Sequence, residues 1–414
     1  MKRIYLPSLW RVAVFVSALI AARFAYYSAA AADIAFERPA DALELNSRNA
    51  VALRALASRL MQQGPDKARA AEAEELAKRS LDISLVNAPA FRVLGQVASF
   101  RNDHERARAM MTIALRLSRR EAAAHVWMAG ELAQRGRLAA SVHELDLALR
   151  IEPSLATTIF PVMLLFANDP AGKFVLARVI RENPNWLQDF VKFVVASPTN
   201  SIAISPILVI NGGLPEDGTY RESESSVIKN LISAGREGMA VDLFLNLPFS
   251  NHASLTSTSL RSYHDGIDYP PVDWDINSNH AIDTEIDADS KRLIIEVSGG
   301  PDGVAATKLL KLPPGSYVGT IPALEGSGVG AASARWTLEC IGDMQPRSTL
   351  SIPVENLRNS ILFQIDATCS LQRLSLHVSG EGGHELLDLR VAPPLLRRAP
   401  AISTEAVNEA RHSG

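Results

Sequence analysis

Residues 88–121 read APAFRVLGQVASFRNDHERARAMMTIALRLSRRE, and residues 122–155 read AAAHVWMAGELAQRGRLAASVHELDLALRIEPSL. Equivalent residues of the two segments lie 34 positions apart, such as Leu94 and Met128 or Ala107 and Ser141. Leu60 precedes Leu94 by the same 34 residues, which indicates a third, less regular unit. Large apolar and small residues at a fixed spacing predict a stack of helix pairs, because one pair alone cannot bury its apolar face.

The repeated pattern resembles the tetratricopeptide repeat (TPR). The resemblance is carried by Leu94-Gly95 in the first helix of a unit, by the small residue Ala107 in the second helix and by the terminal Pro153. It implies a TPR-like α-solenoid over residues 35–154. Upstream, Ala42–Asn46 predicts the end of another helix, offset by four residues through an insertion near Gly64-Pro65-Asp66.

The same resemblance implies where this array would bind a partner. It assigns the concave face to first-helix positions, among them Arg92, Gln96 and Ser99. A groove for a peptide carboxylate needs basic residues, and only Arg92 supplies a positive charge at these positions. We therefore expect a nearly uncharged face that binds proteins of the cell envelope.

Residues 155–250 keep helix-like apolar runs but lose the repeat spacing. Helical lengths of about ten residues between Pro and Gly breaks predict divergent helix pairs that extend the solenoid. Within this region, Ile207–Tyr220 contains Asn211-Gly212-Gly213 and Pro215, which predict a turn-rich loop.

After Asn251 the sequence changes to short β-branched or alternating runs, such as Arg292–Val297 and Thr349–Val354. Turn signals separate these runs at intervals that are typical of an antiparallel β-sandwich. The sequence thus predicts an α + β multidomain protein, in which the solenoid is followed by a jelly-roll-like sandwich over residues 265–393 and a flexible tail over residues 394–414. Strand spacing alone supports the similarity to carbohydrate-binding jelly rolls.

Two aromatic residues of the β-domain, Trp274 and Tyr317, are candidates for stacking on a sugar ring. Trp336 alternates with Leu338 in a predicted strand, which favours a core position for Trp336. Bound polysaccharide is therefore an expected second partner.

The amino terminus carries Lys2, Arg3 and Arg11 before an apolar run. Residues 10–31 predict an uncleaved signal anchor within a segment 1–34, and a cleaved signal peptide is the competing interpretation. Arg23 weakens a clean membrane span. Either interpretation places the bulk of the chain in the periplasm, and the anchor interpretation predicts a single-pass protein of the bacterial inner membrane.

The chain has two cysteines, Cys340 and Cys369, both beside predicted strands. They are expected to form a disulfide in an oxidising compartment, and two separate buried thiols are the alternative. A loop of about 30 residues corresponds to a stabilisation of roughly 3–4 kcal/mol in the chain-entropy model.

Composition and motifs exclude some functions. The net charge of −3 argues against nucleic acid as a partner, and 47 % hydrophobic residues argue against long-range disorder. The sequence contains no metal-ligand or cofactor motif and no motif of an enzyme. The leading hypothesis is a membrane-anchored periplasmic scaffold for protein–protein interaction, in exopolysaccharide or envelope-polymer assembly or export. The alternatives are a polysaccharide-binding module on a helical spacer and a glycoside-active enzyme.

Overall fold

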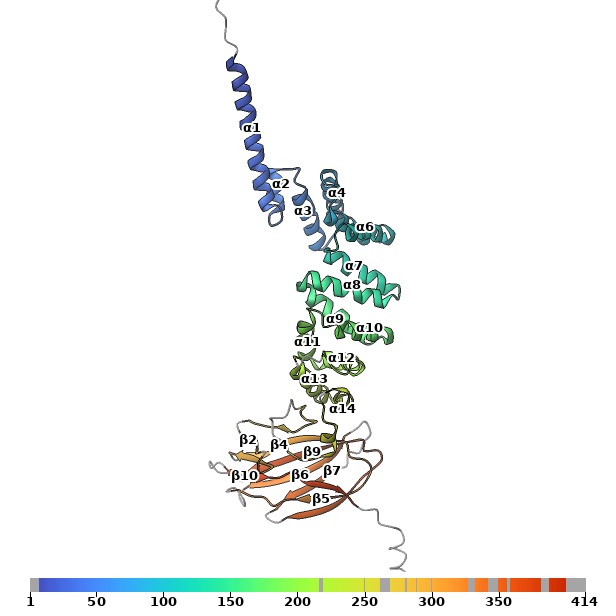
Figure 1. The fold of residues 1–414 in the computed structure, drawn as a ribbon, viewed down its shortest axis with the longest axis vertical. Coiled ribbons are helices and arrows are strands. Elements are labelled where there is room, and N and C mark those ends of the chain that lie inside the picture. The colour runs from blue at the N-terminus through green and yellow to red at the C-terminus, as the bar shows by residue number, and fades with distance from the viewer. Residues whose placement is uncertain are drawn as a thin grey trace, which may run out of the picture. The chain divides into compact units, whose positions relative to one another are not determined.

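The computed structural model describes residues 7–215, 219–248, 250–260, 269–279, 281–287, 289–298, 300–326, 332–341, 349–355, 358–380 and 387–399 (Figure 1). In these residues fourteen α-helices precede eleven β-strands. The chain divides into two compact units, Met1–Met163 and Leu164–Gly414, called the first and second unit below. The predicted fold class, a helical part followed by antiparallel β-sheets, is confirmed.

The first unit contains the predicted helix pairs. Its successive helices are α2 (Pro39–Leu45), α3 (Ala50–Gln62), α4 (Lys67–Ile83), α5 (Ala88–Phe100), α6 (His104–Leu117), α7 (Ala122–Gln134) and α8 (Leu138–Ile151), followed by a 3₁₀ turn, η1 (Pro153–Leu155). The side chains of Asn49, Asp66 and Asp103 accept backbone N–H groups at the starts of α3, α4 and α6. These caps satisfy donors that a helix start leaves unpaired, and they fix where each helix begins.

Small residues allow the paired helices to approach each other. Ala57, Ala73 and Ala107 are fully buried. A Cβ atom added at Gly95 on α5 would lie 3.0 Å from side-chain atoms of Met111 on α6. The pattern of small residues therefore has a packing role, as the repeat spacing predicts.

The first repeat unit differs from the predicted alignment. Helix α3 begins at Ala50 and α5 begins at Ala88, a step of 38 residues, whereas α5 and α7 begin 34 residues apart. The extra residues lie in the α3–α4 loop and in α4, which has 17 residues against 14 in α6. Ala57, which lies 38 positions before Gly95, is consequently the equivalent of Gly95, whereas a 34-residue step would have matched Gly95 with Met61.

Helix α1 (Pro7–Ile34) occupies the predicted membrane anchor, but that prediction is wrong. None of the helices is both long and apolar enough to cross a bilayer, within the residues that the structure describes. Arg23 lies over the ring of Tyr27 at 5.2 Å, and Ala31, inside the predicted span, is fully buried in a cluster with Ala42 and Ala52. The end of α1 thus packs on protein, and the inner-membrane and periplasmic location inferred from an anchor is not supported.

Six helices follow the repeats. They are α9 (Ala156–Ala167), whose residues are divided between the two units, α10 (Pro170–Arg181), α11 (Leu187–Val195), α12 (Pro198–Asn211), α13 (Arg221–Ser233) and α14 (Glu237–Asn246). Helix α12 continues through the first part of the predicted loop Ile207–Tyr220 and has Pro206 in its interior. Proline usually ends a helix, which explains why the sequence pattern gave no sign of α12.

The β-domain begins after a short 3₁₀ helix, η2 (His252–Thr256), and every strand pair among its described residues is antiparallel. One sheet has the order β1 (Asp275–Ile276), β4 (Gly300–Leu310), β9 (Leu371–Gly380), β6 (Ala332–Ile341) and β7 (Thr349–Val354). The second has the order β10 (Leu387–Val391), β3 (Arg292–Val297) and β2 (Ile282–Asp287). The third has the order β11 (Leu395–Arg398), β5 (Gly315–Ile321) and β8 (Asn359–Ile365).

One core joins the three sheets of the β-domain. It contains residues of every sheet, among them Trp336, Leu293 and Ile321, and Trp336 is fully buried as predicted. Strand β11 corrects the predicted tail, because Leu395–Arg398 pairs with β5. The rest of that tail, residues 400–414, lies outside the described residues.

Candidate functional site

The first unit has an open groove between α3 and α5, with a volume of about 450 Å³. Its lining residues come from α3, α5, the segment before α2 and the loop before α7. They are Phe36, Arg54, Ala55, Ser58, Arg59, Gln62, Pro89, Arg92 and Glu121.

Arg92, the predicted cation of the concave face, lines this groove but is only 9 % exposed. Its guanidinium donates to Glu121 Oε2 at 3.0 Å, to Gln96 Oε1 at 3.0 Å and to Ser58 Oγ at 2.9 Å. Arg92 therefore joins α3, α5 and the start of α7, and much of its hydrogen-bonding capacity is used inside the protein. Gln96 supports Arg92 in this network.

Ser99, the third predicted residue, makes a different contact. Its Oγ accepts a hydrogen bond from Trp127 Nε1 of α7 at 2.9 Å, and Ser99 is absent from the groove lining. The structure thus brings Arg92 and Gln96 together, whereas Ser99 fixes the packing of α5 on α7.

Two further arginines line the groove, and the sequence pattern missed both. With the 38-residue step, Arg54 is the α3 equivalent of Arg92 on α5. Arg59 donates to the carbonyl oxygens of Phe36 at 3.0 Å and Glu37 at 2.6 Å, while Arg54 donates to Asn87 Oδ1 at 3.5 Å. Phe36 is 76 % exposed, so the hydrogen bonds of Arg59 hold an accessible aromatic ring at the groove.

A second hollow of about 380 Å³ lies beside the groove and shares Arg54, Pro89 and Glu121 with it. Its remaining lining comes from the starts of α3 and α5, from the end of α6 and from the loops that precede α5 and α7. These residues are Ala50, Val51, Ser84, Val86, Asn87, Ala88, Leu117 and Ser118.

The two predicted sugar-stacking residues of the β-domain lie in its core. Trp274 is 6 % exposed and packs edge-on against Trp336, and Tyr317 is 5 % exposed and stacks on Phe363. The Tyr317 hydroxyl donates to Pro313 O at 2.8 Å. This corrects the expectation of an exposed aromatic pair, because buried rings cannot offer their faces to a pyranose.

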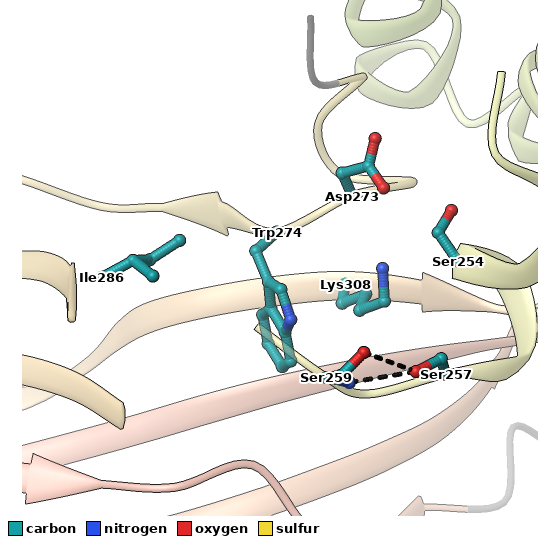
Figure 2. Close-up of a pocket in the computed structure, with 7 residues that line it drawn as sticks. All are labelled: Ser254, Ser257, Ser259, Asp273, Trp274, Ile286 and Lys308. Carbon is teal, nitrogen blue, oxygen red and sulfur yellow. Dashed lines mark hydrogen bonds between the residues drawn. The ribbon is translucent and has the colours of Figure 1, made fainter. Parts of the chain in front are cut away.

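A cavity of about 20 Å³ lies beside Trp274, and Figure 2 shows its lining residues. Lys308 of β4 is 2 % exposed, donates to Val272 O at 2.8 Å and has Nζ 5.8 Å from the centre of the Trp274 ring. Trp274 Nε1 and Ser254 Oγ are buried without a hydrogen-bond partner among the described residues. A volume of this size holds about one water molecule and excludes a sugar ring.

Cys340 of β6 and Cys369, just before β9, are joined as a disulfide with their Cα atoms 5.5 Å apart. That separation lies in the usual range for disulfides. The bridge links a strand to the loop before its neighbour, since β6 pairs with β9.

No group of three or more His, Cys, Asp or Glu side chains is placed to hold a metal ion in the described part of the chain. The side chains that give the groove its chemical character are its three arginines, the carboxylate of Glu121 and the exposed ring of Phe36.

Comparison with known proteins gives likenesses in structure alone. No protein-family model matches the chain, and no curated protein matches its sequence. The TPR protein YrrB, whose structure is described as having an unusual peptide-binding site, is 13 % identical, covers 50 % of this chain and 89 % of its own, and has a TM-score of 0.26.

Two structures of other proteins are similar to part of this chain. TmCBM61, in complex with beta-1,4-galactotriose, is 11 % identical, covers 31 % of this chain and 90 % of its own, and has a TM-score of 0.23. A putative sugar binding protein from Bacteroides thetaiotaomicron is 11 % identical, covers 31 % of this chain and 88 % of its own, and has a TM-score of 0.21. Because all these TM-scores are low, none of the likenesses assigns a family, a ligand or a partner to this chain.

Proposed function

We propose that the chain is a protein-binding scaffold without enzymatic activity, and that the groove of the first unit binds an extended acidic segment of a partner protein. The observation that carries the proposal is the grouping of Arg54, Arg59 and Arg92 around an open groove beside the exposed ring of Phe36. Arginine and aromatic side chains are the residues that most often dominate protein–protein binding energies.

The charge of the groove favours an acidic segment. Three arginines and one glutamate line it, which gives the groove a local charge of +2 on a chain whose net charge is −3. Glu121 is the carboxylate of the groove and already pairs with Arg92. An incoming carboxylate would therefore meet Arg54 and Arg59, whose planar guanidinium groups suit bidentate hydrogen bonds.

The apolar part of the groove favours a segment that also carries a large apolar side chain. Phe36 and Pro89 both line the groove and offer ring surfaces to a ligand. Burying an apolar side chain against them contributes roughly 1.5–3 kcal/mol, which would set the register of the bound segment.

The β-domain supports the scaffold over the alternative of a polysaccharide-binding module. Its five described aromatic residues, Tyr269, Trp274, Tyr317, Trp336 and Phe363, are buried or half-buried. Polysaccharide binding would then need surface features other than aromatic rings in that part of the structure. The process in which the scaffold acts, assembly or export of exopolysaccharide or another polymer, stays a prediction of the sequence resemblance.

The proposal can be tested with a fluorescein-labelled extended peptide that is rich in aspartate and glutamate and has a central leucine. We expect fluorescence anisotropy to report binding by the full chain. Arg54→Glu should weaken binding by at least about tenfold, equivalent to about 1.4 kcal/mol. Phe36→Ala should weaken it through loss of the ring contact.

Arg178→Glu is the matched control, because Arg178 is exposed on α10 in the second unit. It reverses the same charge and should leave the dissociation constant unchanged. Failure of the unmodified chain to bind the peptide, or equal binding by Arg54→Glu, would refute the proposal.

A further inference from the structure

Exposed apolar residues of the helix pairs gather at one edge of the array. Between Ala35 and Glu152, eight large apolar side chains are exposed, and six of them border the three loops that lead from one helix pair to the next. These six are Leu45, Val51, Ile83, Leu85, Val86 and Leu117. This set, called the loop edge below, is distinct from the groove, whose exposed apolar residue is Phe36.

The three loops lie side by side. Ser80 Oγ donates to Ala50 O at 2.7 Å, and Asn87 Nδ2 donates to Ser80 Oγ at 2.8 Å, which ties the loop before α5 to the start of α3. Val51, Val86 and Leu117 line the hollow of about 380 Å³ together. The edge therefore offers both a projecting pair, Leu85 at 80 % and Val86 at 77 % exposure, and a recess next to it.

Folding does not require aliphatic residues in the loop before α5. Each of the three loops has four residues, since α2, α4 and α6 end at Leu45, Ile83 and Leu117 while α3, α5 and α7 begin at Ala50, Ala88 and Ala122. The second and third loop positions are Ser47-Arg48 in the first loop, Leu85-Val86 in the second and Arg119-Arg120 in the third. Polar residues thus form the same four-residue turn in the first and third loops, so Leu85 and Val86 have a role other than packing.

Charges around the loop edge indicate what covers it. Five exposed arginines belong to these loops or to the helix ends next to them: Arg48, Arg79, Arg116, Arg119 and Arg120. The exposed acids within the same distance of these loops are Asp41, Glu44 and Asp82. A second copy of this chain would bring two sets of arginines together, which disfavours self-association, whereas a carboxylate-rich partner would be attracted.

We propose that the loop edge is a second protein-binding surface, which takes a partner helix that has an aliphatic stripe flanked by aspartate or glutamate. Leu85 and Val86 pack on the stripe, an aliphatic side chain of the partner enters the recess beside Val51 and Leu117, and the flanking carboxylates lie against the arginines. This surface goes beyond the groove of the proposed function, and both can be occupied by different parts of one partner.

The test uses a fluorescein-labelled amphipathic helical peptide with leucines on one face and glutamates beside them, and a counterpart with lysines in place of the glutamates. We expect the full chain to bind the acidic helix, and Leu85→Asp to weaken binding at least tenfold. Leu362→Asp is the matched control, because Leu362 is 65 % exposed on β8 and lies outside the array. It should leave binding unchanged.

Three outcomes would overturn the inference. They are equal binding by Leu85→Asp, equal binding of the lysine counterpart, and a dimer in sedimentation equilibrium that Leu85→Asp dissociates, which would make a second copy the occupant. The test of the loop edge can be distinguished from the test of the groove. Phe36→Ala should leave the acidic helix bound, and Leu85→Asp should leave the extended peptide bound.

Discussion

The helix pairs and the β-domain use their large apolar residues in different ways. In the helix pairs, residues 35–152 expose eight such side chains, and six of them form one edge. In the described part of the β-domain two are exposed, Leu362 and Leu395, and the aromatic rings lie inside or at the margin of the core. The surface suited to binding is therefore on the helices, and the aromatic residues of the β-domain are used for packing.

The two regions also differ in what holds them together. The helix pairs approach closely through small buried residues such as Ala57, Ala73 and Ala107. The β-domain is built around large rings such as Trp336 and has a disulfide in addition. Substitutions should accordingly act on one region and leave the other intact, and four predictions test that separation.

The largest effect is expected from Ala107→Arg on α6. Ala107 is fully buried between paired helices, so an arginine would both overpack the contact and bury a charge, which is expected to cost on the order of 5 kcal/mol. Hydrogen exchange measured by mass spectrometry should show loss of protection over residues 50–151 with the β-domain unchanged. Ala109→Arg is the control, because Ala109 is exposed on the same helix. A thermal melt of Ala107→Arg that matches that of the unmodified chain would contradict the repeat packing.

The second effect concerns the β-domain alone. Replacing Cys340 and Cys369 by serine removes a cross-link between residues 29 apart, which should destabilise the β-domain by about 3–4 kcal/mol. Exchange in residues 50–151 should not change. Before reduction, unfolded protein made in an oxidising compartment should have no thiol that iodoacetamide can alkylate. Two alkylated cysteines under those conditions would show that the residues are separate thiols.

The helix pairs were predictable because their packing fixes a spacing. The predicted alignment fails in the first repeat unit, α3 and α4, for an equally physical reason. This repeat is longer than the next one by four residues, which is about one helical turn, so Leu56 and Leu60 both fall on one face of α3. The 34-residue step therefore matched Leu60 with Leu94 and hid the equivalence of Arg54 and Arg92. For this reason one of the three groove arginines was predicted and Arg54 and Arg59 were not.

Other errors came from residues whose local signals compete with tertiary packing. Pro206 signals a helix end but lies inside α12. Pro393-Pro394 signals an end to regular structure but precedes β11, which pairs with β5. Trp274 precedes a strand of two residues, so alternation could not show which way its ring points. The alternating β3 and β7, in contrast, have the predicted bounds.

The third prediction concerns pH and the second unit. Glu224 of α13 is 5 % exposed, and burial raises its pKa to about 7, against the opposing effects of the Leu214 N–H at 2.7 Å and of nearby Tyr269 and Arg221. The pKa of Glu224 is higher in the folded chain than its usual value of 4.5. The contribution of Glu224 to the stability of the fold is therefore complete below about pH 4.5 and is lost as the pH rises through about 7. The second unit should lose about 3 kcal/mol over this range.

Glu224→Gln keeps a neutral acceptor for the Leu214 N–H and should remove this pH dependence. Urea unfolding at about pH 5 and about pH 8 measures it, with hydrogen exchange assigning the change to residues 164–399. Glu222→Gln, at an exposed position of the same helix, is the control. An equal pH slope in Glu224→Gln and the unmodified chain would show that Glu224 is not the group responsible.

The smallest effect is expected in the first unit and has the opposite sign. Glu74 of α4 contacts Lys78 at 2.9 Å, Arg101 at 2.5 Å and Arg106 at 3.2 Å. Its hydrogen bond with Lys78, supported by Arg101 and opposed by burial, lowers the pKa of Glu74 to about 2. The stabilisation is then present above pH 4.5 and is lost as pH falls toward 2. Because the three cationic side chains are about half exposed, solvent screening should limit the effect to about 1 kcal/mol or less.

Glu74→Gln should therefore destabilise residues 50–151 slightly near neutral pH, and the difference from the unmodified chain should shrink on acidification and in high salt. Glu72→Gln, exposed on the same helix, removes one carboxylate outside the cluster and is the matched control. Hydrogen exchange at several pH values gives both comparisons in one molecule, since Glu74 acts on the first unit while Glu224 acts on the second. If Glu74→Gln and the unmodified chain had equal stability over residues 50–151 at every pH, the cluster around Glu74 would have no net stabilising role, because a carboxylate that is stabilised in its charged form must lose that contribution when it takes up a proton.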